Sequence, residues 1–146
     1  MNAARLTALK ALQQRVREAN GPSHELDIAL TQFFYPEMGV DVLSAHGARL
    51  DRSLDACLSL MREVLPGWTW KVGTCCVSDD AWVAPDLNCP VHGERLRAEF
   101  GDIEFGSIWD TGVDIDRRPP GNVPLALIEA IIAAKITKEE AREVVA

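Results

Sequence analysis

The spacing of apolar residues changes along the chain, and this change constrains the fold more than any other feature of the sequence. Before Pro66 the apolar residues recur every three or four positions, which is typical of amphipathic helices. After Gly67 they alternate with polar residues, which is typical of strands with one buried face. From Pro124 the helical spacing returns. The pattern predicts helices, then a sheet, then helices, in one domain of 146 residues.

The helices can be placed by their apolar stripes and by the signals at their ends. We predict helices over residues 3–19, 23–34, 53–65, 124–136 and 137–145. Ser23 is a suitable N-cap for the second of them. The helix at 124–136 is apolar over more than half of its circumference, so we expect it to be deeply buried. Thr137-Lys138-Glu139-Glu140 has the form of a capping box, which predicts that a separate last helix begins there.

The sheet is predicted to lie between residues 68 and 109. Trp68 and Trp70 share one face of a first strand, and we expect both to pack beneath a helix. Residues 81–84 fit a short second strand, and a turn at Gly101-Asp102 would join two further strands in a hairpin with all its apolar side chains on one face. We therefore expect an α+β fold in which an antiparallel meander of about four strands is sandwiched between helices, an alpha-beta-alpha arrangement.

Charge and patterning exclude two classes of partner. The net charge is -7, which argues against attraction to nucleic acid or to anionic lipid. The longest apolar stretch, at 123–136, is short and is interrupted by Glu129, so we expect no membrane-spanning segment. The first 20 residues lack the apolar core of a signal peptide. We therefore expect a cytosolic protein whose four cysteines are thiols.

Residues 75–92 hold three of the four cysteines and one of the three histidines, so they are the first candidate for a chemical site. Cys89 and His92 have the spacing of a zinc knuckle, but the other half would be the adjacent pair Cys75 and Cys76. Adjacent residues point to opposite faces of a strand, so at most one of these two sulfurs can reach the metal. The candidate zinc ligands are Cys76, Cys89 and His92, with a fourth to come from Glu94, Asp79, Asp80 or His46. Alternatively, Cys76 continues the buried face of the first strand while Cys89 and His92 lie in a surface loop.

Two other patterns are compatible with catalysis, but neither leads us to assign a catalytic residue. Asp110 begins an Asp-Thr-Gly sequence after two apolar residues, as in aspartic proteases, in which a chain with a single motif must dimerise. The helical pattern of the residues that follow favours a polar turn at the end of a strand instead. Cys89, His92 and Asp86 are the nearest set for nucleophilic catalysis, although closeness in sequence is no evidence for such a set.

Two tryptophans flank predicted loops, where an aromatic side chain belongs either to the core or to a binding surface. They are Trp82 and Trp109. Together with Asp110, which follows Trp109 directly, they are the candidate binding residues.

The segments at 50–73 and 119–136 carry a further pattern. In the first, a helix that contains Ser53, Asp55 and Ala56 runs into a strand through Pro66-Gly67-Trp68, and the second contains Pro-Leu-Ala-Leu at 124–127. These segments resemble a family of small phage and prophage proteins with the phage alpha-beta-alpha sandwich domain. Val123 departs from the threonine that is usual in that family, and the cysteine-rich stretch at 75–92 is an insertion. The resemblance implies a sheet packed between helices, a phage origin and the cytoplasm of the bacterial host, but no active site.

From these observations we expect a non-catalytic bacteriophage or prophage accessory protein that binds a host protein or a small molecule. Inhibition of a host defence pathway is one form that this activity could take. The alternative is a zinc-dependent binding or hydrolytic protein that uses Cys75 or Cys76, Cys89 and His92. The sequence indicates no cofactor besides this zinc ion, and it leaves a homodimer open.

Overall fold

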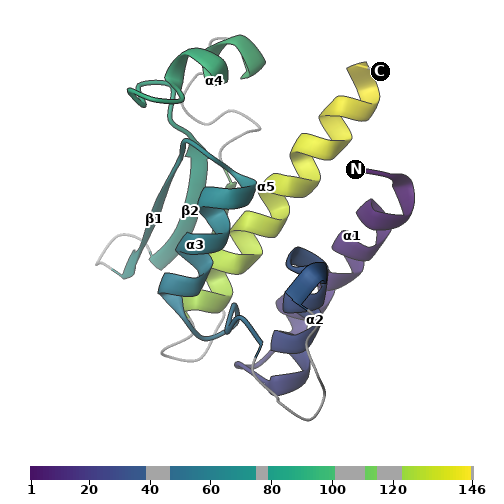
Figure 1. Cartoon of the computed structure of the whole chain (residues 1–146). Coiled ribbons are helices and arrows are strands. Elements are labelled where there is room, and N and C mark those ends of the chain that lie inside the picture. Colours follow the sequence, from purple (N-terminus) through teal and green to yellow (C-terminus); the bar gives the residue numbers. More distant parts are fainter. Residues whose placement is uncertain (39–46, 75–78, 101–110, 115–122, 146) are drawn as a thin grey trace.

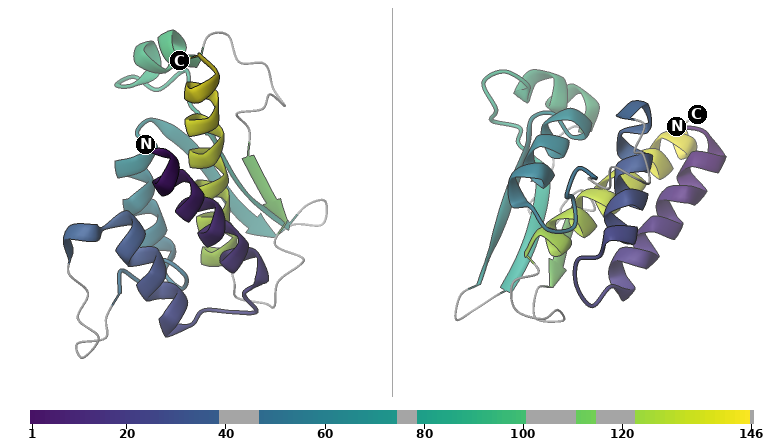
Figure 2. Two further views of the ribbon diagram at one scale, coloured as in Figure 1. Left: turned by 90° about the vertical axis from the view of Figure 1, so that its right-hand side faces the viewer. Right: turned by 60° about the horizontal axis from the view of Figure 1, so that its bottom comes forward.

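One long helix, α5 (Val123–Val145), organises the protein. The computed structural model describes residues 1–38, 47–74, 79–100, 111–114 and 123–145. α5 contacts the sheet on one side and the helix α1 (Ala3–Glu18) on the other. Figure 1 shows this arrangement, with the sheet and α1 on opposite sides of α5. The right-hand view of Figure 2 shows α3 (Leu54–Val64) and α5 between the sheet and the pair formed by α1 and α2 (His24–Phe34).

The core is centred on α5, as its apolar pattern predicts. Five large side chains of this helix are completely buried: Leu125, Leu127, Ile128, Ile131 and Ile132. α1 contributes Leu6, Leu9, Leu12 and Val16 to the same core. Glu129, which interrupts the apolar stretch, is 7% exposed and pairs with Arg17 of α1, whose Nε lies 3.1 Å from its Oε1. This pairing compensates for the burial of the carboxylate.

The prediction that a separate helix begins at residue 137 is wrong, because α5 continues without interruption to Val145. A capping box requires Thr137 to leave the helical conformation and to accept a hydrogen bond from the following turn. Instead, the Thr137 hydroxyl donates to the carbonyl oxygen of Ala133, one turn earlier, at 3.0 Å. Burial continues past this point, since Lys138 and Glu139 are only 8% and 5% exposed. Packing of this last segment outweighs the capping signal.

The sheet differs from the predicted four-strand meander. Its described part has three strands in the order β1 (Trp68–Thr74), β2 (Asp79–Pro85) and β3 (Thr111–Asp114), and both pairs are antiparallel. Among the described residues, α3 and α5 lie on the same face of this sheet, so they do not sandwich it. The prediction of an antiparallel meander of about four strands between helices is therefore wrong.

The error arose at residues 93–100, which form the helix α4 (Gly93–Phe100) and not a strand. Leu96 and Phe100 fit an alternating pattern, but they are also four residues apart and therefore share a helix face. Arg95 and Glu99 form an ion pair at 3.1 Å that the helical spacing allows. The predicted hairpin turn at Gly101-Asp102 lies outside the described residues.

The remaining elements begin and end close to their predicted positions. α1, α2 and α3 each start and stop within one residue of the predicted ranges 3–19, 23–34 and 53–65. Ser23 is the N-cap of α2, as predicted, because its hydroxyl accepts a hydrogen bond from the amide of Leu26 at 3.1 Å. A 3-10 helix, η1 (Pro36–Met38), follows α2. Within the described ranges, none of the helices combines the length and the apolar character that crossing a bilayer requires.

Candidate functional site

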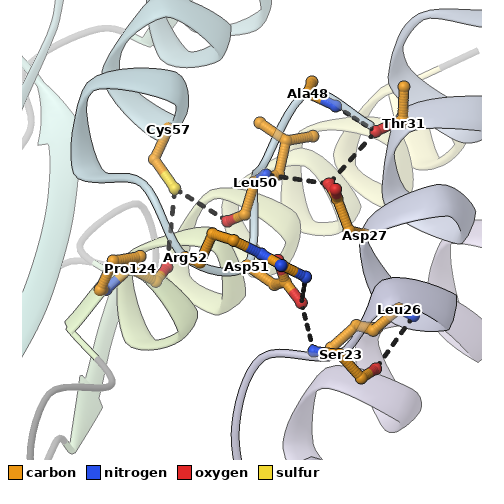
Figure 3. A network of polar contacts seen from close by, with 10 residues as sticks. All are labelled: Ser23, Leu26, Asp27, Thr31, Ala48, Leu50, Asp51, Arg52, Cys57 and Pro124. Atoms are coloured by element: carbon orange, nitrogen blue, oxygen red, sulfur yellow. Dashed lines mark hydrogen bonds and ion pairs between the residues drawn. The ribbon is translucent and has the colours of Figure 1, made fainter. Parts of the chain in front are cut away.

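A network of buried polar contacts joins α2 to the segment that leads into α3, and Figure 3 shows its residues. Asp27 of α2 is 3% exposed, and its Oδ1 accepts hydrogen bonds from the amide of Leu50 at 3.3 Å and from the Thr31 hydroxyl at 3.4 Å. The Thr31 oxygen in turn accepts a hydrogen bond from the amide of Ala48 at 2.8 Å. Two backbone amides of the segment are therefore bound by α2 side chains.

Asp51 ties the same segment to the start of α2. It is 1% exposed, and it accepts a hydrogen bond from the amide of Ser23 at 2.7 Å and one from Nε of Arg52 at 2.9 Å. Ser53 then caps α3 by accepting a hydrogen bond from the amide of Ala56 at 3.2 Å. The start of α3 is thereby held at a fixed position relative to α2.

Cys57 joins α3 to the start of α5. Its thiol donates to the carbonyl oxygens of Leu50 at 3.1 Å and of Pro124 at 3.6 Å. Burial is the main reason why the pKa of the Cys57 thiol is raised to about 12. A thiol that stays protonated is a poor nucleophile, so Cys57 has a structural role. Because Asp27 and Asp51 lie below the surface and already accept protein hydrogen bonds, the whole network is suited to fix α3 and not to bind a ligand.

The helix that this network positions forms one wall of a surface groove. The groove has a volume of about 140 Å³, and β1 forms its other wall. Its lining comprises the apolar residues Leu58, Met61, Leu65, Trp68 and Trp70 together with Gly67 and the charged Arg62.

The two tryptophans of the groove differ in their surroundings. Trp68 is 8% exposed and packs edge-to-face against Phe100 of α4, with 5.8 Å between ring centroids. Its indole Nε1 is buried and has no hydrogen-bond partner among the described residues. Trp70 is 43% exposed although it lies on the same face of β1. The prediction that both tryptophans are buried beneath a helix is therefore correct for Trp68 and wrong for Trp70.

Trp70 is exposed because β1 is an edge strand. In the described sheet β1 pairs with β2 on one side only, and Trp70 lies opposite Val83, which is completely buried. On the sheet face that carries Trp70 and Val83, the side chain on β2 is therefore buried, whereas the side chain on β1 is partly exposed to solvent.

The backbone of β1 presents hydrogen-bonding groups to this open edge. The register pairs Trp68 with Pro85, so Gly67 lies opposite Asp86 one residue further along. The carbonyl oxygen of Gly67 accepts a hydrogen bond from the amide of Asp86. In an antiparallel pair, residues whose backbone groups face the partner strand alternate with residues whose groups face away. Counting from Gly67, Thr69 and Lys71 face β2, whereas Trp70 and Val72 direct their N–H and C=O groups to the open edge.

One positive charge at the groove has no counterpart in the described structure. Arg62 is exposed and makes neither an ion pair nor a hydrogen bond with another described residue. A guanidinium group beside an exposed indole is a common composition for the centre of a protein interface.

Trp82, the one predicted binding residue within the described ranges, does not line this groove. Trp82 is half-buried on β2, where it lies opposite Lys71 and therefore on the other face of the sheet from Trp70. Trp109 and Asp110 lie outside the described residues.

The predicted metal ligands are described only in part. Cys89 and His92 are half-buried in the turn before α4, where the Cys89 carbonyl accepts a hydrogen bond from the amide of Gly93 at 2.8 Å. Cys75 and Cys76 lie outside the described residues. Within the described ranges no three histidine, cysteine or acidic side chains are grouped as a metal ion would require. The zinc site therefore stays a prediction, which metal analysis of the purified protein tests directly.

Sequence reasoning missed Trp70, Arg62 and Asp27 as residues of interest. The exposure of Trp70 depends on the order of the strands in the sheet, which the alternation of apolar residues does not encode. Arg62 fits an exposed position on a helix, and nothing in the sequence places it beside a tryptophan. For Asp27 a signal was present, because Asp27 and Thr31 lie one turn apart beside the apolar stripe of α2 and can share a buried face.

Comparison with known proteins gives no match. No family model matches the chain, and neither the curated proteins nor the solved structures include one that matches it.

Proposed function

We propose that this is a non-catalytic binding protein that contacts a partner protein through the groove between α3 and β1. The observation that carries the proposal is the position of Trp70, which is 43% exposed and lines the groove. Tryptophan is among the residues that contribute most to protein interfaces, because it buries a large apolar area with little loss of side-chain entropy.

The size of the groove favours a protein over a small molecule as partner. Pockets that enclose drug-sized ligands usually measure ~300–1,000 Å³, whereas this groove measures about 140 Å³. A cavity of ~150 Å³ can hold a molecule as small as benzene. The groove therefore fits a single side chain, and such a side chain would be presented by a larger partner.

The class of partner follows from the resemblance to phage proteins. We propose that the protein acts in a bacterial host and binds a host protein, with inhibition of a defence pathway as one form of this activity. This part of the proposal is supported by the sequence segments at 50–73 and 119–136 alone. The sheet packed between helices that the resemblance implied is not found among the described residues, where α3 and α5 lie on one face of the sheet.

Site-specific photo-crosslinking tests the proposal. A photoreactive amino acid replaces Trp70 in one variant and Val91 in a matched control, because Val91 is 81% exposed but lies in the turn before α4 and outside the groove. Both variants are irradiated in bacterial lysate. We expect a discrete adduct from position 70 only, and we expect excess wild-type protein to suppress it. Equal adducts from both positions, or suppression by excess Trp70→Ala protein to the same degree, would contradict the proposal.

A further inference from the structure

We infer that the partner is bound as an extended segment that adds a strand to the open edge of β1. One apolar side chain of this segment occupies the groove, and one acidic side chain pairs with Arg62. This inference rests on the proposed function and specifies the chemistry of the partner.

The backbone of β1 has unpaired hydrogen-bonding groups at its open edge, within the part of the chain that the structure describes. Trp70 and Val72 direct their N–H and C=O groups away from β2, and no described strand lies beyond them. By contrast, the amide of Trp68 faces the same way but already donates to the carbonyl oxygen of Leu65 at 3.1 Å. The open part of the edge therefore begins at Trp70. Such an edge is a template for an additional strand, which supplies hydrogen bonds without reading side chains.

The groove can accept one side chain of the added strand. Successive side chains of an added strand would point alternately to the two faces of the sheet. Those on the face of Trp70 would extend toward α3, where Leu58, Met61 and Trp70 leave the space of about 140 Å³. One branched aliphatic side chain fills a space of this size. The backbone therefore provides affinity, and the groove selects an apolar residue at one position of the segment.

The charge of Arg62 favours an acidic residue in the added strand. Arg62 lines the groove and has no ion-pair partner among the described residues. An acidic side chain next to the apolar one would form a charge-assisted hydrogen bond with the guanidinium group. Pairing of β1 with a second copy of this chain is disfavoured for a different reason, because each copy carries a net charge of -7 and the two copies repel each other.

Selection from displayed short linear peptides of random sequence tests the inference with a defined probe. The immobilised wild-type protein is the target, and Trp70→Ala protein is used to remove unspecific binders. We expect enriched peptides that alternate apolar and polar residues and contain an acidic residue. Their affinity should fall by about tenfold or more in Trp70→Ala, as for a residue at the centre of an interface, and by a smaller factor in Arg62→Gln.

Two variants at Val72 separate strand addition from ordinary groove binding. Val72→Pro removes the N–H that faces the open edge, at a position where an edge strand tolerates proline, while Val72→Ala keeps it. We expect Val72→Pro to weaken the selected peptides by about fivefold to tenfold, which corresponds to a lost hydrogen bond, and Val72→Ala to have little effect. Methylation of single backbone nitrogens in the peptide is a second test that leaves the protein unchanged, and alternate positions should be sensitive.

The outcomes distinguish this inference from the function on which it rests. If Trp70→Ala abolishes binding while Val72→Pro and peptide methylation have no effect, the groove binds a partner but strand addition is wrong. If no peptide is enriched over the Trp70→Ala target, both are wrong. If sedimentation shows a dimer that Val72→Pro dissociates, the strand that adds to β1 belongs to a second copy of the chain and the inference is overturned.

Discussion

Replacement of Gly47 by alanine should lower the free energy of unfolding when residue 27 is aspartate. The same replacement should raise it when residue 27 is alanine. Gly47 lies against the buried carboxylate of Asp27, and a Cβ atom built on Gly47 would be 2.5 Å from Oδ2, 2.6 Å from Cγ and 2.7 Å from Oδ1. Ordinary contacts of a Cβ atom begin at 3.4 Å, so the loop or the carboxylate must move by about 1 Å. The three nearest atoms all belong to Asp27, which makes the effect specific to this one side chain.

The expected magnitudes follow from the hydrogen bonds of Asp27. The Asp27→Ala substitution leaves the buried amide of Leu50 without its acceptor, which costs about 1–3 kcal/mol of unfolding free energy. Gly47→Ala alone should cost about 2 kcal/mol, because displacement of the carboxylate loses the same hydrogen bonds. In the Asp27→Ala background the clash is absent, and Gly47 does not have a positive φ. There the same substitution should stabilise the protein by about 0.4–1 kcal/mol, since alanine restricts the unfolded chain.

Urea denaturation of the wild type, the two single variants and the double variant, followed by circular dichroism, gives the four free energies. We expect a coupling of about 2–3 kcal/mol between the two substitutions. If Gly47→Ala has the same cost in both backgrounds, the carboxylate of Asp27 does not lie against Gly47 and the account of how α3 is positioned is wrong.

Three further predictions concern single residues. Thr137→Ala should leave stability unchanged or raise it by up to about 0.5 kcal/mol in thermal unfolding, because Thr137 lies inside α5; a loss of about 1 kcal/mol would show that it is an N-cap after all. Cys57 in the native protein should react with iodoacetamide at least about tenfold more slowly than the half-buried Cys89, because burial raises the pKa of the Cys57 thiol to about 12. Peptide mass spectrometry measures both rates, and equal rates would refute the burial of Cys57. Lys138 is 8% exposed, its Nζ lies 3.7 Å from Oε1 of Glu99, and its pKa is lowered mainly by burial. Lys138→Met should therefore keep the free energy of unfolding or raise it by up to about 1 kcal/mol. A loss above about 2 kcal/mol would mean that the ion pair is strongly stabilising.

The helices that could be predicted are those whose pattern has only one interpretation. The stripes of α1, α2 and α3 have a regular spacing and clear end signals such as Ser23, so their limits follow from the sequence. At 93–100 the spacing of Leu96 and Phe100 fits a strand and a helix equally well. Tertiary packing decided between the two, since Leu96 is completely buried and Phe100 packs on Trp68.

The candidate site could not be predicted because it depends on how the elements are assembled. The sequence shows that Trp70 and Trp68 share a strand face, but not that β1 is an edge strand. Likewise, the sequence shows that Arg62 lies on α3, but the groove forms only where α3 and β1 lie side by side in the folded chain. Of the predicted site residues, Cys76, Trp109 and Asp110 lie outside the described residues, whereas Trp82, Cys89 and His92 are described but do not line the groove.

Amide hydrogen exchange along β1 is the most direct test of the claim that this edge binds a strand. In the free protein, we expect the amides of Trp70 and Val72 to exchange much faster than those of Thr69 and Lys71, which face β2. Saturation with a selected peptide should slow exchange at Trp70 and Val72 by at least about tenfold and leave Thr69 and Lys71 nearly unchanged. Protection of Trp70 and Val72 in the free protein, or no change on saturation, would contradict the account.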